Sequence, residues 1–366
     1  MDAQVVDERL GNVLSMDIYG LSWYTLYQME VQGKPSAKYN VDNVYLYLRA
    51  LMEEDRDALH IALYDKEVAV GVLLGYYVLL KSKFYSERNL RQGLFRVLKV
   101  IKSYIDDYAA GGEVLYALKK LDTVTGLVKE FINVDDRIRG ELSKLKDNLL
   151  KDSLRIEEAE DISYIIWVVC ETAIYDKNGE KNLLEIILND RLYNLVAVDY
   201  KSAPVYANAL SNIILKCKFK IEGEIYDVLY EKTEELIKTL GFYVKEFEKE
   251  ENVDMALVGK LKLGVYNLEK ALRKLGALDE VQRTKRKYGI LLAIAIASII
   301  VLLLTLYVAP QVLLSFLFSN MSIIIGALLS ILIIVVDSTL RKSKILELIK
   351  LLSNIIINAI SKVKSR

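Results

Sequence analysis

The stretch from Tyr288 to Val336 reads YGILLAIAIASIIVLLLTLYVAPQVLLSFLFSNMSIIIGALLSILIIVV and contains no Asp, Glu, Lys, Arg or His. As one helix it would be about 73 Å long, whereas about 20 residues cross the hydrocarbon core of a bilayer. The run must therefore be divided, and Pro310 marks the expected break. The sequence predicts a two-helix transmembrane hairpin over 288–337, with spans at about 289–309 and 312–336. The outer turn falls between 309 and 322.

Both ends of this hairpin are basic, which places them in the cytoplasm by the positive-inside rule. We therefore expect an integral membrane protein with two spans and both termini cytoplasmic. Small residues recur every four positions on each span, a spacing that lets helix backbones approach closely. The flanking bases are Lys285, Arg286, Lys287, Arg341, Lys342 and Lys344, and the small residues are Gly289, Ala293, Ala297, Ser322, Gly326 and Ser330.

One amphipathic helix is expected on each side of the hairpin. Residues 338–366 form a basic one, which suits an anionic lipid surface, the soluble domain or a bundle of copies. Residues 253–287 form a stalk or linker helix, whose apolar positions alternate spacings of four and three. This seam predicts either a coiled coil between copies or a helix packed on its own domain. Its members are Leu257, Leu261, Gly264, Leu268, Ala271, Leu275 and Leu278.

Residues 1–252 show helical periodicity, which predicts an all-α cytoplasmic domain, either a helical bundle or an irregular α-solenoid. The segment Asn182–Cys217 is similar to an armadillo or HEAT unit. The apolar run Val68–Leu80 is too short to span a bilayer and predicts a buried core helix. Expected turns are Gly33–Ser36, Gly111–Gly112 and Asp176–Gly179. The expected helices are 3–14, 18–31, 41–52, 55–82, 86–109, 113–132, 135–151, 155–175, 180–190, 203–217 and 222–250.

The formal net charge of zero hides a split between the two ends of the chain. Residues 281–366 carry a net charge of +9 and residues 1–280 one of −9, which argues against a general nucleic-acid binder. Within the acidic part, the expected helix 86–109 has a basic face opposite its apolar face. This face predicts either a surface for an anionic partner or a solvated face paired with the domain's own acids, such as those of Glu222–Asp254. Its members are Arg88, Arg91, Phe95, Arg96, Lys99 and Lys102.

Catalytic and cofactor motifs are missing from the sequence. It has one histidine, His60, and two isolated cysteines, Cys170 and Cys217. Neither a P-loop nor a Gly-x-Gly-x-x-Gly motif occurs. The acids of Glu157–Asp161 are of the type used in acid–base chemistry, but a solvated surface is the simpler interpretation. We therefore predict no catalytic, cofactor-binding or metal-ligating residue. Abundant Ile, Lys, Glu and Tyr, with little Gln, His and Cys, are typical of a thermophile.

These features favour a membrane-anchored helical scaffold or tether that recruits a cytoplasmic protein partner to the bilayer. A subunit of an oligomeric channel is an alternative, because a helical seam leads into the spans and a homo-oligomer would be needed to enclose a pore. The outline resembles the magnesium-channel family, but Tyr307–Pro310 stands where that family has Gly-Met-Asn. A membrane-surface enzyme that uses carboxylates is a second alternative. A nucleic acid or an RNA-containing partner is a further alternative, which the overall charge does not support.

Overall fold

The computed structural model describes residues 16–108, 111–150, 154–172, 177–216, 221–249 and 254–278. Nearly all of them belong to the compact unit Met1–Leu275. These residues contain helices and no strand, which confirms the all-α bundle expected for this part of the chain. No helix among them is both long and apolar enough to cross a bilayer. The expected helix 3–14, the hairpin at 288–337 and the helix at 338–366 lie outside the described residues.

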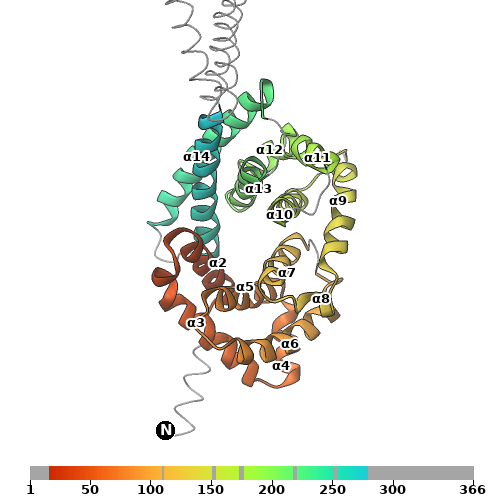
Figure 1. Cartoon of the computed structure of the whole chain (residues 1–366), viewed down its shortest axis with the longest axis vertical. Helices are drawn as coiled ribbons and strands as arrows, with labels where there is room; N and C mark the ends of the chain where they lie inside the picture. The colour runs from red at the N-terminus through yellow and green to blue at the C-terminus, as the bar shows by residue number, and fades with distance from the viewer. Residues whose placement is uncertain are drawn as a thin grey trace, which may run out of the picture. The chain divides into compact units, whose positions relative to one another are not determined.

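Four helices form a central row in which each packs on the next (Figure 1). They are α5 (Lys66–Ser82), α7 (Gly112–Thr125), α10 (Ile156–Thr172) and α13 (Ala203–Lys216). The buried stretches of α5, α10 and α13 carry no charged side chain, as expected for helices that are covered all round. Helix α7 is also covered, although it carries charged residues. Every residue from Ala69 to Leu79 is buried, so the predicted core helix is confirmed.

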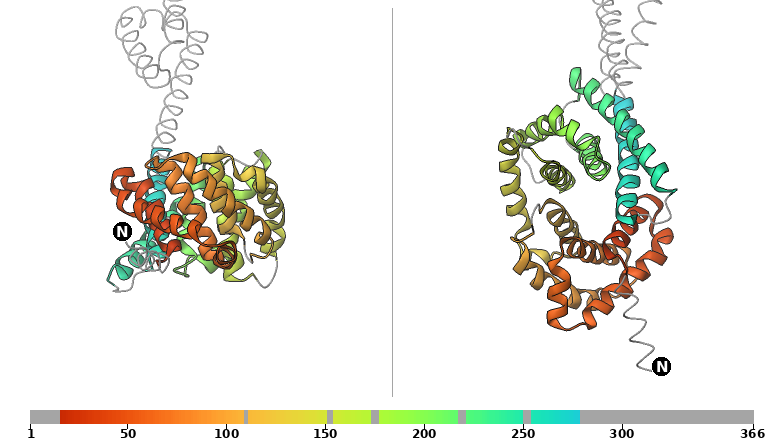
Figure 2. Two further views of the ribbon diagram at one scale, coloured as in Figure 1. Left: turned by 90° about the horizontal axis from the view of Figure 1, so that it is seen from below. Right: turned by 180° about the vertical axis from the view of Figure 1, so that it is seen from behind.

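The other helices lie around this row (Figure 2, right), and longer ones such as α3 (Lys34–Glu53), α6 (Glu87–Tyr104) and α14 (Glu224–Phe247) bury one face. A strongly amphipathic helix packs its apolar face inward and leaves its charges in water. The remaining surrounding helices are α4 (Arg56–Tyr64), α8 (Val128–Phe131), α9 (Val134–Leu150), α11 (Lys177–Ile187) and α12 (Asp190–Val196).

Helix α2 (Ile18–Tyr27), which continues into the short π-helix η1 (Gln28–Gln32), lies between α5 and the helix 255–278. Glycines permit both contacts. A Cβ atom at Gly71 would lie 2.8 Å from the Tyr19 backbone, and one at Gly259 would lie 2.9 Å from the Trp23 backbone. The helix 255–278 then reaches α13, where the Lys274 ammonium donates to the Ile214 carbonyl at 2.6 Å. It therefore links α2, at one end of the row, to α13 at the other.

The expected seam of this last helix is buried within the helical unit. Leu261, Leu268, Ala271 and Leu275 are fully covered. The compact unit extends to Leu275, so residues 255–275 of the expected stalk pack within the domain that was expected to end at 252. The helix 255–278 is therefore packed on its own domain, which is the second of the two interpretations of the seam.

Several helix boundaries differ from those expected, and three of the differences have a clear local cause. Asp65 divides the expected helix 55–82, because its carboxylate accepts from the amides of Glu67 and Val68 and so caps α5. The expected loop Gly33–Ser36 is shorter, since Gly33 makes the turn with a φ of 91° and α3 begins at Lys34. Gly126 ends α7 with a positive φ, which separates α8 from it.

Candidate functional site

The residues predicted to form the basic face lie on α6, with their side chains exposed. The opposite face of α6 is buried through Leu90, Leu94, Val97 and Ile101, and it packs on α4, α5 and α8. The helical period therefore separates the two faces as predicted. We call Arg88, Arg91, Phe95, Arg96, Lys99 and Lys102 the α6 basic face.

Two of its cations are held by neighbouring atoms. The Arg91 guanidinium pairs with Glu87 one turn earlier, at 2.8 Å. Arg96 donates to the carbonyl of Met52 at 2.7 Å and to that of Glu54 at 3.4 Å, at the carboxyl end of α3. Carbonyls at a helix end attract cations. Arg96 therefore has a structural role in addition to its charge.

The other three cations, Arg88, Lys99 and Lys102, make no hydrogen bond or ion pair with any residue that the structure describes. Phe95 lies among them and is 48% exposed, although its ring packs edge-on against Phe131 with centroids 4.8 Å apart. The face thus combines unpaired positive charge with an exposed aromatic ring.

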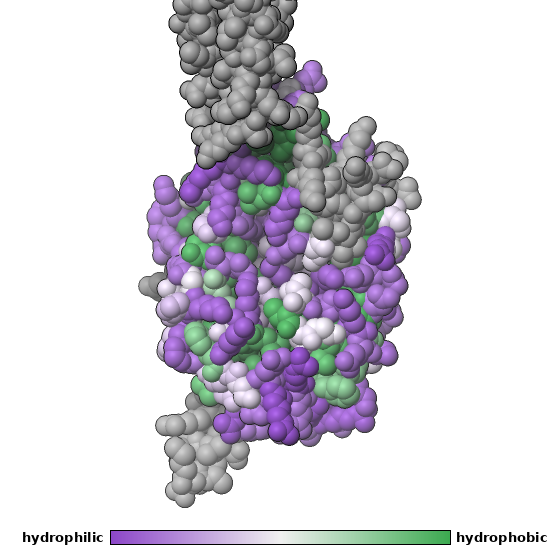
Figure 3. Space-filling view, viewed as in Figure 1, coloured by the Kyte–Doolittle hydropathy of each residue, from purple (hydrophilic) through white to green (hydrophobic). Residues whose placement is uncertain are grey.

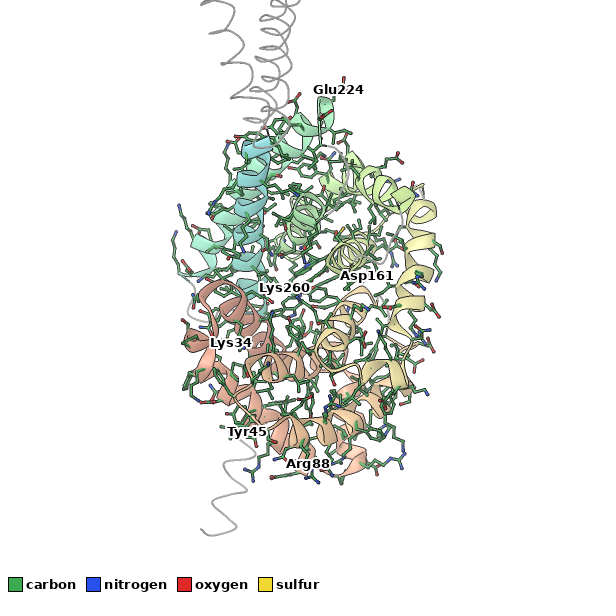
Figure 4. The ribbon with its side chains drawn as sticks, in the orientation of Figure 1. Lys34, Tyr45, Arg88, Asp161, Glu224 and Lys260 are labelled. Atoms are coloured by element: carbon green, nitrogen blue, oxygen red, sulfur yellow. The ribbon has the colours of Figure 1, made fainter. Side chains whose placement is uncertain are left out.

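The described acids of the range Glu222–Asp254 do not pair with this face. They lie mainly on α14, which is on the far side of the helical unit from α6, as the labels of Glu224 and Arg88 show in Figure 4. Several of them pair locally instead, as Glu234 does with Lys238 at 3.0 Å and Glu248 with Lys262 at 2.6 Å. The expected pairing of the basic face with this acidic region is absent from the described residues.

The interior holds a charged centre that the sequence did not predict. Glu113, at the start of α7, is buried and its Oε1 accepts from Tyr19 Oη at 2.7 Å, Tyr164 Oη at 2.8 Å and Trp23 Nε1 at 3.2 Å. The Lys260 ammonium lies 2.8 Å from the same oxygen. Burial alone would raise the pKa of Glu113, but Lys260 and these hydrogen bonds outweigh burial and hold that pKa below its ordinary value.

Two further charges of α7 are paired with acids on other helices. The Lys119 ammonium lies 2.5 Å from Asp135, and the Lys120 ammonium lies 2.5 Å from Glu171. Both lysines are almost completely buried. Charges inside a protein are found paired because an unpaired one is strongly disfavoured. This pairing lets α7 occupy the central row despite its charges.

The acids at the start of α10 are only partly a solvated surface. Glu157 is exposed, whereas Glu160 and Asp161 are half-buried. Asp161 accepts a hydrogen bond from the Gly112 amide at 3.1 Å and lines a cavity of about 510 Å³, together with Arg137 and Lys144. Burial raises the pKa of Asp161 to about 7. The predicted simple surface is therefore wrong for this residue.

The histidine and the described cysteine that the sequence analysis named both lie in ordinary packing environments. His60 Nδ1 lies 3.0 Å from Tyr104 Oη, and Cys170 is buried in α10. No group of three acid, histidine or cysteine side chains suited to a metal ion is found among the described residues. Cys217 lies outside them, as do the membrane residues Gly289, Ala293, Ala297, Ser322, Gly326 and Ser330 and the flanks Lys285, Arg286, Lys287, Arg341, Lys342 and Lys344.

Sequence periodicity found the α6 basic face but missed Glu113 and Lys260, and the sequence interpretation placed Asp161 on a solvated surface. In the sequence, the only sign of Glu113 and Lys260 was a charged residue on a helix whose other residues are typical of a core helix or of the apolar seam. Comparison of the chain with protein-family models, with curated proteins and with solved structures found no match.

Proposed function

We propose that the protein is a membrane-anchored tether whose α6 basic face holds an acidic surface of a cytoplasmic protein partner. The observation that carries this proposal is a set of three cations, Arg88, Lys99 and Lys102, that have no partner among the described residues and lie around the exposed Phe95. An aromatic ring surrounded by arginine and lysine is typical of protein interfaces, where aromatic anchors contribute much of the affinity and charges set orientation and on-rate.

Charge favours a protein partner over a long nucleic acid. The face extends over residues 88–102, about 21 Å of helix, whereas residues 1–280 as a whole carry a net charge of −9. A long phosphate backbone would meet repulsion beyond this short face. The surface seen in Figure 3 is mostly hydrophilic with small scattered apolar patches, so it offers no broad apolar area for docking. A compact acidic protein surface fits these limits.

The membrane part of the proposal rests on the uncharged run 288–336 and its basic flanks. The channel alternative loses its main support, because the seam that would join copies is buried in the chain's own domain. The enzyme alternative gains Asp161 and its cavity. It has no second group with a defined catalytic role among the described residues, and we keep the tether as the proposal.

Affinity purification of the full chain in mild detergent tests this proposal. One variant carries Arg88→Glu, Lys99→Glu and Lys102→Glu. A matched control carries Lys201→Glu, Lys238→Glu and Lys245→Glu, which lie on the surface elsewhere and change the net charge equally. We expect the wild type and the control to recover the same acidic protein. The α6 variant should recover at least about tenfold less of that protein. Salt of about 0.5 M should also release the partner.

Two results would contradict the proposal. One is equal recovery of the partner by the α6 variant and the wild type, which would place the contact elsewhere. The other is the absence of any partner that the wild type recovers reproducibly. Circular dichroism of each variant checks that its helical fold is intact.

A further inference from the structure

A cavity of about 210 Å³ lies among η1, α7, α10, α13 and the helix 255–278. It is separate from the α6 basic face. Its walls include the aromatic side chains Tyr116 and Trp167 and the charged side chains Lys120 and Glu171. Ligand pockets of drug-sized molecules have volumes of about 300–1,000 Å³, so a cavity of this size suits a smaller molecule.

Two buried polar atoms of the wall lack a partner. The Tyr116 hydroxyl and the Oε2 atom of Glu171 make no hydrogen bond with any described residue, although both are shielded from solvent. Tyr116 is 0% exposed. Buried polar groups are nearly always hydrogen-bonded, and each exception requires an explanation. Two exceptions on the wall of one cavity point to a molecule that supplies the missing bonds.

The interior of the cavity favours a neutral hydrogen-bond donor over a cation. The Lys120 ammonium donates to the other oxygen of Glu171 at 2.5 Å and lies 5.7 Å from the centre of the Tyr116 ring. A second ammonium group beside Lys120 would be repelled by it, and the other carboxylate of the wall, Glu30, already accepts from the Lys81 ammonium at 2.5 Å. Burial raises the pKa of Tyr116, so its hydroxyl keeps its proton and can donate or accept. A hydroxyl group of a ligand can therefore donate to Glu171 and bond with Tyr116.

The wall also carries two lysines with exposed side chains. The Lys216 ammonium on α13 lies 3.8 Å from the Oε1 atom of Glu171. Lys270 lies 4.0 Å from the centre of the Tyr266 ring and has no ion pair with a described residue. Exposed ammonium groups at a cavity attract anions and hold them as point charges. This outer part of the cavity suits a carboxylate or a phosphate.

We infer that this cavity binds a small hydroxylated anion, with a hydroxyl group on Tyr116 and Glu171 and a carboxylate or phosphate near Lys216 and Lys270. The inference does not depend on the proposed tether. A hydroxy acid and a hydroxyalkyl phosphate share this chemistry, and only binding measurements separate them.

Thermal unfolding of the full chain in detergent tests the inference, with glycerate and glycerol 3-phosphate as probes at about 10 mM. Propionate lacks the hydroxyl groups and glycerol lacks the charge. We expect glycerate or glycerol 3-phosphate to raise the melting temperature of the wild type, and the larger rise identifies the anionic group. Propionate and glycerol should bind about tenfold more weakly or not at all.

Tyr116→Phe is the informative variant, because it removes an unpaired hydroxyl without changing the shape of the core. Its unliganded melting temperature should equal or exceed that of the wild type, and its apparent affinity for the better probe should fall about tenfold. Lys270→Met tests the anion contact at an exposed residue and should also weaken binding. Tyr39→Phe, at a tyrosine that is 76% exposed, is the control and should bind as the wild type does.

Two results would overturn the inference. If neither probe changes the melting temperature of the wild type, the cavity holds water only. If Tyr116→Phe and Lys270→Met both bind the probe as tightly as the wild type, the probe binds elsewhere.

Discussion

The Lys260 ammonium lies 2.8 Å from the Glu113 carboxylate, and both side chains are buried, with 8% and 6% exposure. This pair joins the helix 255–278 to the first turn of α7. The rings of Tyr19, Trp23 and Tyr164 surround it, with the Lys260 ammonium 4.9 Å from the first two ring centres and 5.5 Å from the third. Figure 4 shows Lys260 near the centre of the helical unit. The charge pair therefore fixes the last described helix to the core.

Removing one member of this pair should strongly destabilise the fold. Lys260→Met leaves the Glu113 carboxylate buried without its cation, so we expect the free energy of unfolding to fall by about 3–5 kcal/mol. The matched control is Lys262→Met on the same helix, where the pair with Glu248 is partly exposed and the loss should be below about 1 kcal/mol. Denaturant unfolding of the full chain in detergent measures both. Equal losses of unfolding free energy in the two variants would show that the buried Glu113–Lys260 pair contributes no more to stability than the partly exposed Lys262–Glu248 pair.

The close approach of the helix 255–278 to α2 gives a second prediction. Gly259→Ala places a methyl group 2.9 Å from the Trp23 backbone, so the helices must separate and we expect a loss of about 1–3 kcal/mol. Gly241→Ala in the interior of α14 meets no atom within 4 Å and should stabilise the protein by about 0.5–1 kcal/mol. The same unfolding measurement compares them. A neutral Gly259→Ala variant would contradict the close packing of these helices.

Asp161 should make stability depend on pH. Its pKa is about 7 in the folded protein, against an ordinary value of 3.8. The folded state therefore keeps a proton that the unfolded state loses, and the stability from Asp161 is lost as the pH rises from about 4 to about 7. Asp161→Asn cannot ionise, so its stability relative to the wild type should increase between pH 5 and pH 8. Asp107→Asn, at an exposed residue, is the control. A relative stability that does not change with pH would contradict the burial of Asp161.

Periodicity predicted those parts of the fold in which each helix follows its own sequence pattern. The two faces of α6 separate at helical spacing, and the run Ala69–Leu79 is buried because it lacks charge. The seam of Leu261 and Leu268 was correctly expected to face an apolar surface. Its partner was not predictable, since Gly259 and Gly264 meet α2 and α13 only through tertiary packing.

The buried charges were not predicted either, because their partners are also set by tertiary packing. Lys119 and Lys120 look like the solvent face of an amphipathic helix, and their acidic partners Asp135 and Glu171 lie on other helices. Asp65 was read as part of one long helix, although an aspartate that accepts from two amides is a helix start. Helix α12, which begins after the capping Asn189, was also missed.

Photo-crosslinking in intact cells tests the tether most directly. A photoreactive residue at Lys99, on the α6 basic face, is compared with one at Lys238, on the exposed surface of α14. We predict a discrete adduct with an acidic protein at Lys99, found in the membrane fraction and lost when Arg88→Glu and Lys102→Glu are introduced, and no such adduct at Lys238. The same adduct at both positions, or none at Lys99, would contradict the proposal that this face holds a partner at the membrane.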